Sequence, residues 1–328
     1  MNRFIALLTL SAAVGLSHTA YSAEGQSTSE LWRHAMSGNV AGVMTILERG
    51  GDVNHASPTG MTPLMWAVQE GNQELIDLLL DKGADVNAFN HRAGCNALIL
   101  AGEWLQPQNV EALIQRGAQV NYQSRLGWTA LLKSVRVVPR NFEERTRQLA
   151  VVKTLLANGA DVKVRADKGA TPLILAAKSG NKALLELLLD YRAEIDAQDK
   201  GGNTALMWAA KLGHLEAVNL LLAHHASVSK NHVCGCTALL LASEQGHDQV
   251  VQALLDHQSD IHAKNEDGMT ALMFAAQKGH LKTVSLLFER GARVNDMNNH
   301  GATARLLAIE NRHDEVEQFL QAAGGRCF

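Results

Sequence analysis

A glycine in the same local context returns at a nearly constant interval along this chain, and that period constrains the fold more than any other feature. Consecutive glycines of the series lie 34, 33, 42, 33, 33, 33 and 33 residues apart, at Gly60, Gly94, Gly127, Gly169, Gly202, Gly235, Gly268 and Gly301. A fixed period of about 20–50 residues is typical of repeat proteins, whose units bury their apolar faces only against their neighbours. The sequence therefore predicts an elongated array of small units.

The residues around these glycines repeat as well. Gly60 is followed by Met-Thr-Pro-Leu and Gly169 by Ala-Thr-Pro-Leu, and several others are followed by one variable residue and Thr-Ala-Leu. Each unit closes with a variant of Gly-Ala-Asp-Val-Asn, as at residues 83–87. The pattern resembles the ankyrin family, whose unit has a period of 33 residues and carries the signature Thr-Pro-Leu-His-x-Ala. The resemblance covers essentially all of the chain after residue 23.

The resemblance implies an all-α repeat solenoid of about nine ankyrin repeats, each a helix-turn-helix followed by a β-hairpin loop. The first and last units are atypical caps. We place the units near residues 24–56, 57–89, 90–122, 123–164, 165–197, 198–230, 231–263, 264–296 and 297–328. The one interval of 42 residues puts a nine-residue insertion in the fourth unit, within residues 134–148, between its two helices.

Local chemistry agrees with this assignment. Thr62 is a helix N-cap whose hydroxyl accepts from a backbone N–H, and Pro63 suits the first helical position. Gly83 suits the left-handed position after the second helix. Three successive units replace that glycine by Arg192, His225 and Gln258. Because a non-glycine residue there costs ~1 kcal/mol, we expect residues 165–263 to be the least stable stretch.

The first 23 residues are typical of a secretory signal peptide. Arg3 is followed by an apolar run from Phe4 to Leu16 and then by small residues, and cleavage after Ser22 or after Ala23 both fit. The apolar run is shorter than the ~20 residues that a membrane span requires. No cysteine precedes Cys95, so we expect no lipid anchor. The sequence predicts a periplasmic or secreted protein with no membrane span.

Charge and motifs disfavour several classes of function. The chain has 30 Lys+Arg against 33 Asp+Glu, without the basic excess of a nucleic-acid-binding protein. It has no nucleophile elbow, phosphate-binding loop or His-Glu-x-x-His, so we expect no enzyme activity and no cofactor. Four histidines at a 33-residue spacing are expected to form a structural ladder: His214, His247, His280 and His313.

One cluster has residue types suited to metal or redox chemistry. His232, Cys234 and Cys236 lie in the seventh unit, shortly after His225, and both zinc and copper accept such ligands. The Cys-x-Cys spacing is shorter than structural zinc sites favour, and variable loop tips also acquire such residues by drift. Cys95 and Cys236 occupy equivalent positions four units apart, too far for a disulfide. We expect the thiols to be unpaired or redox-active.

The resemblance implies that a partner binds the concave face formed by hairpin tips and the exposed side of the first helices. Trp66 and Trp208 align with each other and are expected to be buried, whereas Trp104 and Trp128 take unusual slots. Free first-helix positions include Lys178 and Lys211. The candidate partner-binding residues, in or next to the third and fourth units, are Trp104, Arg125, Trp128, Arg136, Arg140, His91 and Arg92. Trp128 packing under the insertion, and Trp104 covering a neighbouring helix, are the alternatives.

The function predicted from the sequence is that of a non-enzymatic scaffold, exported from the cytoplasm, that binds a partner protein through its concave ankyrin face. We expect a monomer that binds no nucleic acid and has no membrane span. The alternative is a periplasmic metal- or redox-linked stress protein that uses the Cys/His cluster of the seventh repeat. Delivery to a host cell as an effector is a further possibility. The residues do not identify the partner.

Overall fold

A computed structural model describes residues 23–327, and the predicted signal peptide lies outside this part except for its last residue. Eighteen helices lie in the described residues, two in each predicted unit. The first helices are α1 (Ala23–Met36), α3 (Pro63–Glu70), α5 (Ala97–Glu103), α7 (Ala130–Arg136), α9 (Pro172–Lys178), α11 (Ala205–Lys211), α13 (Ala238–Gln245), α15 (Ala271–Gln277) and α17 (Ala304–Glu310). The second helices are α2 (Val40–Glu48), α4 (Gln73–Asp81), α6 (Pro107–Gln115), α8 (Phe142–Ala157), α10 (Lys182–Asp190), α12 (Leu215–Ala223), α14 (Asp248–Asp256), α16 (Leu281–Glu289) and α18 (Asp314–Ala322).

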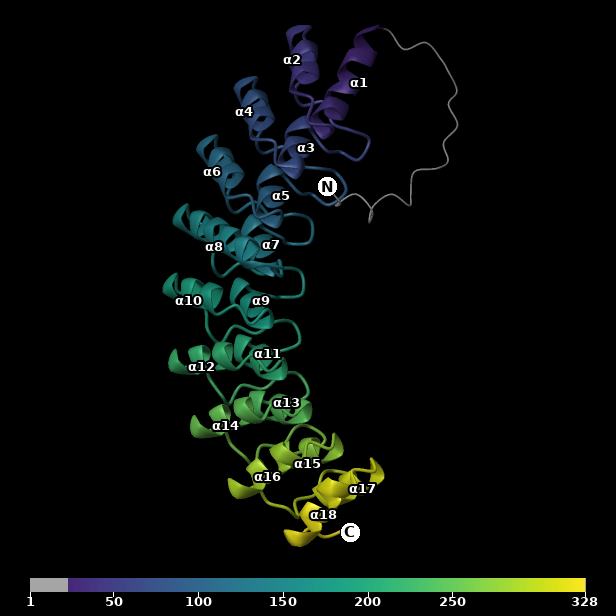
Figure 1. Cartoon of the computed structure of the whole chain (residues 1–328), viewed down its shortest axis with the longest axis vertical. Helices are drawn as coiled ribbons and strands as arrows, with labels where there is room; N and C mark the ends of the chain where they lie inside the picture. Colours follow the sequence, from purple (N-terminus) through teal and green to yellow (C-terminus); the bar gives the residue numbers. More distant parts are fainter. Residues whose placement is uncertain (1–22, 328) are drawn as a thin grey trace, which may run out of the picture.

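The helix pairs stack in one column that bends toward the side of the odd-numbered helices and the long loops (Figure 1). Consecutive odd-numbered helices pack closely on one another, and consecutive even-numbered helices pack less closely. The odd-numbered layer allows this approach because small, fully buried side chains recur at the seventh position after each series glycine, including Ala67, Ala101, Ser134, Ala176, Ala209, Ala242, Ala275 and Ala308. Tight packing on one side and looser packing on the other produce the curvature. The predicted all-α repeat solenoid is confirmed.

The helix ends follow the predicted capping chemistry. The Thr62 hydroxyl accepts from the Met65 N–H at 3.3 Å, and Pro63 begins α3. Gly83 has φ 84°, in the left-handed region, as predicted. Arg192, His225 and Gln258 adopt the same conformation, with φ of 62°, 64° and 64°. The backbone of these three units is therefore strained where the other units use glycine.

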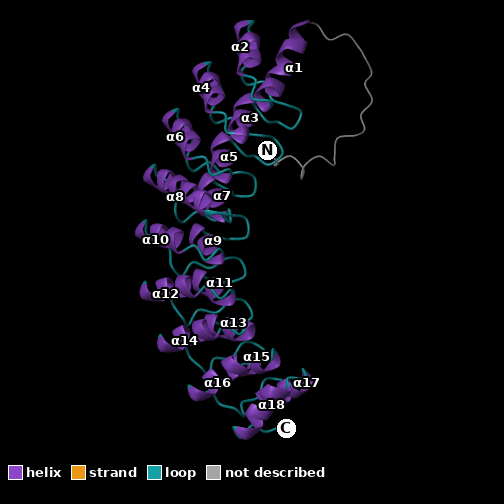
Figure 2. Cartoon of the chain, viewed as in Figure 1, coloured by secondary structure: helices purple, strands orange, loops and turns teal. Residues whose placement is uncertain are grey.

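The loops that were predicted to be β-hairpins form hydrogen-bonded turns. Within the described residues no strand forms, apart from an isolated bridge between Phe89 and Asn96 (Figure 2). From the third unit onward, each tip instead bonds to the next one along the column: the Lys200 N–H donates to the Lys168 carbonyl at 3.0 Å, and the Val233 N–H to the Gly201 carbonyl at 3.1 Å. These bonds join neighbouring loops into one continuous edge.

The expected histidine ladder is also present. His214 and His247 each stand before the second helix of their unit, and their Nε2 atoms bond to the carbonyl oxygens of Lys178 and Lys211 at 3.2 Å. His280 and His313 repeat the contact at 3.0 Å in the next two units. Because a carbonyl only accepts, each Nε2 carries the ring proton. These histidines join neighbouring units and have no lone pair on that nitrogen for a metal.

The insertion of the fourth unit is only partly a loop. Helix α8 has 16 residues, against nine in every other second helix, so much of the extra sequence extends this helix at its N-terminus. Arg140 bonds to Glu144 through its backbone N–H and guanidinium. The buried amide of Gln148 donates to the carbonyl of Val137 at 2.7 Å. These contacts hold the insertion against the column.

No helix in the part of the chain that the structure describes is long and apolar enough to cross a bilayer.

We predict that Arg192→Gly raises the free energy of unfolding by ~1 kcal/mol, because glycine adopts a positive φ without steric cost. The Arg192 side chain is exposed, and a Cβ at the equivalent Gly83 has no neighbour within 4 Å, so the cost is conformational. Arg192→Ala is the matched control, since it removes the side chain but keeps the strain. Urea unfolding of the three proteins measures the difference. A less stable Arg192→Gly variant would show that the position is not strained.

Candidate functional site

A groove of about 720 Å³ lies on the inner face of the column, over α7, α9 and α11 and the loops that precede them. Trp128 and Trp208 contribute aromatic surface, and Ile174 and Leu175 lie among the residues that line the groove. Arg136, Lys168 and Lys178 add positive charge, against the two carboxylates of Asp167 and Asp199. The groove therefore contains tryptophan and arginine, which are enriched in interface hot spots, and its lysines add further positive charge.

The cations belong to a column that the repeat itself creates. The ninth residue after each series glycine lies at the same place on successive odd-numbered helices, which form the inner side of the column. In order along the chain these residues are Gln69, Glu103, Arg136, Lys178, Lys211, Glu244, Gln277 and Glu310. Three consecutive units therefore stack positive charges beside the groove. The sequence analysis identified Lys178 and Lys211 as free first-helix residues, but it did not align them with Arg136.

The structure contradicts the prediction that Trp208 is buried. The side chain was expected to be buried, yet it is partly exposed and lines the groove. Its indole Nε1 donates to an Asp199 carboxylate oxygen at 2.9 Å, which fixes the ring. The Lys178 Nζ lies 3.9 Å from the ring centroid and the Lys211 Nζ 5.8 Å away. Trp66, at the aligned position, is partly exposed as well. Both rings pack against the core on one side and are only partly covered on the other.

Trp128 occupies the other side of the groove. The guanidinium carbon of Arg136 lies 4.9 Å from its ring centroid, and the Lys133 Nζ lies 5.7 Å away. Lys133 also pairs with Glu103 at 2.8 Å. Arg136 also lies 3.9 Å from Glu103. By contrast, Lys178 and Lys211 have no carboxylate within 4 Å among the described residues, so no acidic side chain neutralises their charges.

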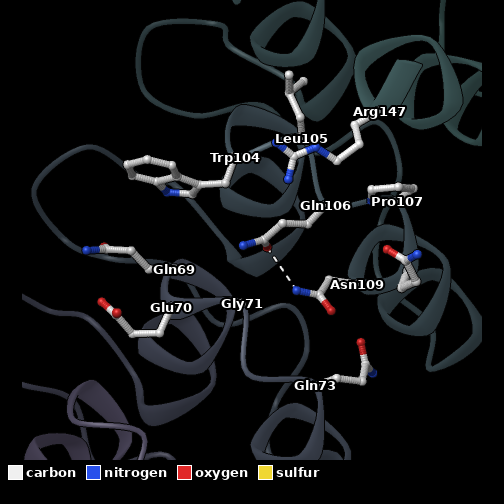
Figure 3. A pocket seen from close by; sticks show the side chains of 11 residues that line it. Gln69, Glu70, Gly71, Gln73, Trp104, Leu105, Gln106, Pro107, Asn109 and Arg147 are labelled. Atoms are coloured by element: carbon white, nitrogen blue, oxygen red, sulfur yellow. Dashed lines mark hydrogen bonds between the residues drawn. The ribbon is translucent and has the colours of Figure 1, made fainter. Parts of the chain in front are cut away.

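Trp104 lies elsewhere. It is the C-cap residue of α5, and its side chain is 43% exposed. Together with Glu70, Gln106 and Arg147 it lines a second hollow of about 410 Å³ (Figure 3). The Asn109 side-chain amide donates to Gln106 at 2.9 Å on its floor. The structure therefore places the two predicted tryptophans in different hollows.

The remaining predicted partner-binding residues are scattered. Arg125 and Arg92 are exposed on neighbouring loop tips. The ring of His91 packs edge-on against Phe89 at 5.9 Å, outside the groove. Arg140 is held by Glu144. Of the seven predicted residues, only Trp128 and Arg136 line the groove.

The Cys/His cluster is compact. The sulfur atoms of Cys234 and Cys236 are 3.3 Å apart, and Nε2 of His232 lies 3.4 Å from the Cys234 sulfur. These three ligand atoms lie within 4.8 Å of one another. His225 is not among them and lies exposed in the turn after α12. The structure therefore brings together three of the four predicted metal-binding residues.

The two sulfur atoms differ in environment. Burial, followed by a hydrogen bond with Cys234, raises the pKa of Cys236 to about 12. Burial and then the charge of Lys211 lower the pKa of His232. At neutral pH, Cys236 is therefore a thiol and His232 a neutral imidazole. The described cysteines are all free, including Cys95 and the exposed Cys327.

Comparison with known proteins agrees with the repeat pattern. The family of ankyrin repeats, in three copies, matches residues 31–136, 144–232 and 239–326. The Neurogenic locus Notch protein of Drosophila melanogaster is 31% identical over 192 residues, which is 52% of this chain and 7% of that protein. The B-cell lymphoma 3 protein homolog of Mus musculus is 35% identical over 117 residues, or 36% of this chain and 24% of the relative. The chain thus spans less than a quarter of each of these two relatives.

Proposed function

We propose that this chain, which belongs to the ankyrin-repeat family, binds a partner protein through the groove over α7, α9 and α11 and catalyses no reaction. The observation that carries the proposal is the pairing of two partly exposed tryptophans with a column of cations on the inner face. Tryptophan and arginine are enriched in interface hot spots, and repeat arrays present extended concave binding surfaces.

The charges define the chemistry of the partner. Asp199 is engaged by the Trp208 indole and Asp167 pairs with Lys200 at 3.5 Å, whereas Lys178 and Lys211 have no acidic partner among the described residues. Complementarity therefore favours a partner segment that presents carboxylates beside aromatic or aliphatic side chains. The carboxylates approach the lysines, and the apolar side chains fill the space between the indole rings.

A photo-crosslinking amino acid at Val138 is predicted to capture one partner in the native compartment, because this side chain lines the groove and is 71% exposed. The same group at Lys153, exposed on α8 beyond the groove, is the control position and is predicted to capture none. Lys178→Glu should weaken binding of the captured partner by about tenfold or more, and Lys153→Glu should leave it unchanged. Equal capture at both positions, or equal effects of both substitutions, would refute the groove as the site.

We also propose that the chain acts outside the cytoplasm, as the predicted signal peptide suggests. The apolar run from Phe4 to Leu16 supports this proposal, because the export machinery recognises such a segment. The partner would then be an exported protein as well.

Amino-terminal sequencing of the exported chain should give Ala23 or Glu24 as the first residue. Leu8→Arg is predicted to block export by placing a charge within the apolar run, whereas Leu8→Ile should not. Cell fractionation followed by immunoblotting measures both. An unprocessed chain in the cytoplasm would rule out this location.

A further inference from the structure

The loop tip before α13 holds two cysteines in a rigid arrangement. The Glu266 N–H donates to the Cys234 carbonyl at 3.1 Å, and the Val233 N–H donates to the Gly201 carbonyl at 3.1 Å. The tip is thereby fixed to the tips of both neighbouring units. Gly235 has φ 78°, which allows the sharp turn that returns Cys236 beneath Cys234. The 3.3 Å separation of the sulfur atoms follows from this clamped backbone.

The hydrogen bonds of His232 determine which chemistry the cluster suits. The Cys234 N–H donates to Nδ1 of His232 at 3.0 Å, so Nδ1 provides the lone pair. A neutral imidazole then carries its proton on Nε2, the atom that faces the Cys234 sulfur at 3.4 Å. A metal bound between this ring and the sulfurs would need a lone pair on Nε2. The ring instead offers the sulfur an N–H donor.

Exposure gives the two cysteines different roles. Cys234 is partly exposed and is the more accessible of the two cysteines, so we assign it the first contact with a reagent from solution. Cys236 is buried, with only 5% of its surface exposed, and its sulfur meets that of Cys234. An accessible thiol backed by a buried second thiol is the arrangement used in dithiol–disulfide chemistry.

We propose that Cys234 and Cys236 form a dithiol site that exchanges with a small-molecule or protein disulfide, with His232 as the residue that positions and polarises Cys234. This inference is independent of the groove and of the identity of the partner protein.

The reaction has two steps. The Cys234 thiolate, hydrogen-bonded to the His232 N–H, attacks a disulfide R–S–S–R, whose S–S bond breaks as a mixed disulfide forms and one thiolate RS⁻ leaves. Cys236, whose pKa is raised by burial and by Cys234, loses its proton to water in the slower second step and attacks the Cys234 sulfur, which releases the second RS⁻ and closes the Cys234–Cys236 bond. The two protons from the cysteines pass through water to the two leaving thiolates. The protein loses two electrons and the external disulfide gains them.

Oxidised glutathione is the probe for this exchange in the full-length chain. After incubation in glutathione buffers, acid quenching and alkylation under denaturing conditions, peptide mass spectrometry should find the 234–236 peptide lacking two hydrogens. Cys327, which is exposed and distant in sequence, provides the internal control and should form only a mixed disulfide with glutathione. A 234–236 peptide whose two thiols stay fully alkylatable, or which carries only glutathione, would overturn the proposal.

Two serine variants separate the steps. Cys236→Ser should accumulate a mixed disulfide at Cys234, since no second thiol resolves it. Cys234→Ser should leave Cys236 largely unmodified, because the remaining sulfur is buried. Equal modification of the two variants would contradict the assigned order.

The role of His232 has its own readout. His232→Ala should slow oxidation about tenfold through loss of a hydrogen bond to a charged sulfur, while His232→Gln, which retains an N–H donor, should recover part of the rate. Metal content measured on the same protein provides the competing outcome. One tightly held metal ion per chain, with both thiols protected from alkylation, would establish a metal site in place of the dithiol.

Discussion

Close packing between consecutive inner helices is the contact on which the rest of the structure depends. Ala176, Ala209 and Ala242 are fully buried between successive first helices, and larger side chains there would separate the units. Each helix pair is too small to bury its own apolar face, so its stability comes from its neighbours. The histidine ladder and the bonds between loop tips reinforce the same nearest-neighbour contacts.

This stacking also explains why the inner face can recognise a partner. Residues at equivalent positions of successive units line up along the column. One basic residue at the same position in each of three successive units therefore places Arg136, Lys178 and Lys211 in one row. Trp128 and Trp208 then provide aromatic surface on both sides of the central unit. The result is a shallow, charged groove along the repeats, which suits an extended segment of a partner protein. The dithiol belongs to a different feature, the edge of linked loop tips.

The fold could be predicted from the sequence because the same local pattern recurs in unit after unit. The threonine caps, the left-handed positions of Arg192, His225 and Gln258, and the histidine ladder were all predicted from the repeat. Leu105 and Arg312 also adopt positive φ, which was not foreseen. The length of α8 was not predicted, because the insertion interrupts the period. The prediction that Trp208 is buried was wrong, because an alignment of repeats does not show how an indole ring is oriented. Sequence spacing also could not show that Trp104 and Trp128 lie in different hollows.

Hydrogen exchange of the Ala209→Leu variant tests the central claim most directly. Leucine overfills the tight contacts of α11 with α9 and α13, at a cost of about 1–3 kcal/mol. If neighbouring units provide the stability, amide protection should fall in α9, α11 and α13 and stay close to that of the unmodified protein in α3 and α17. Equal loss of protection along the whole column, or no loss near α11, would contradict the account.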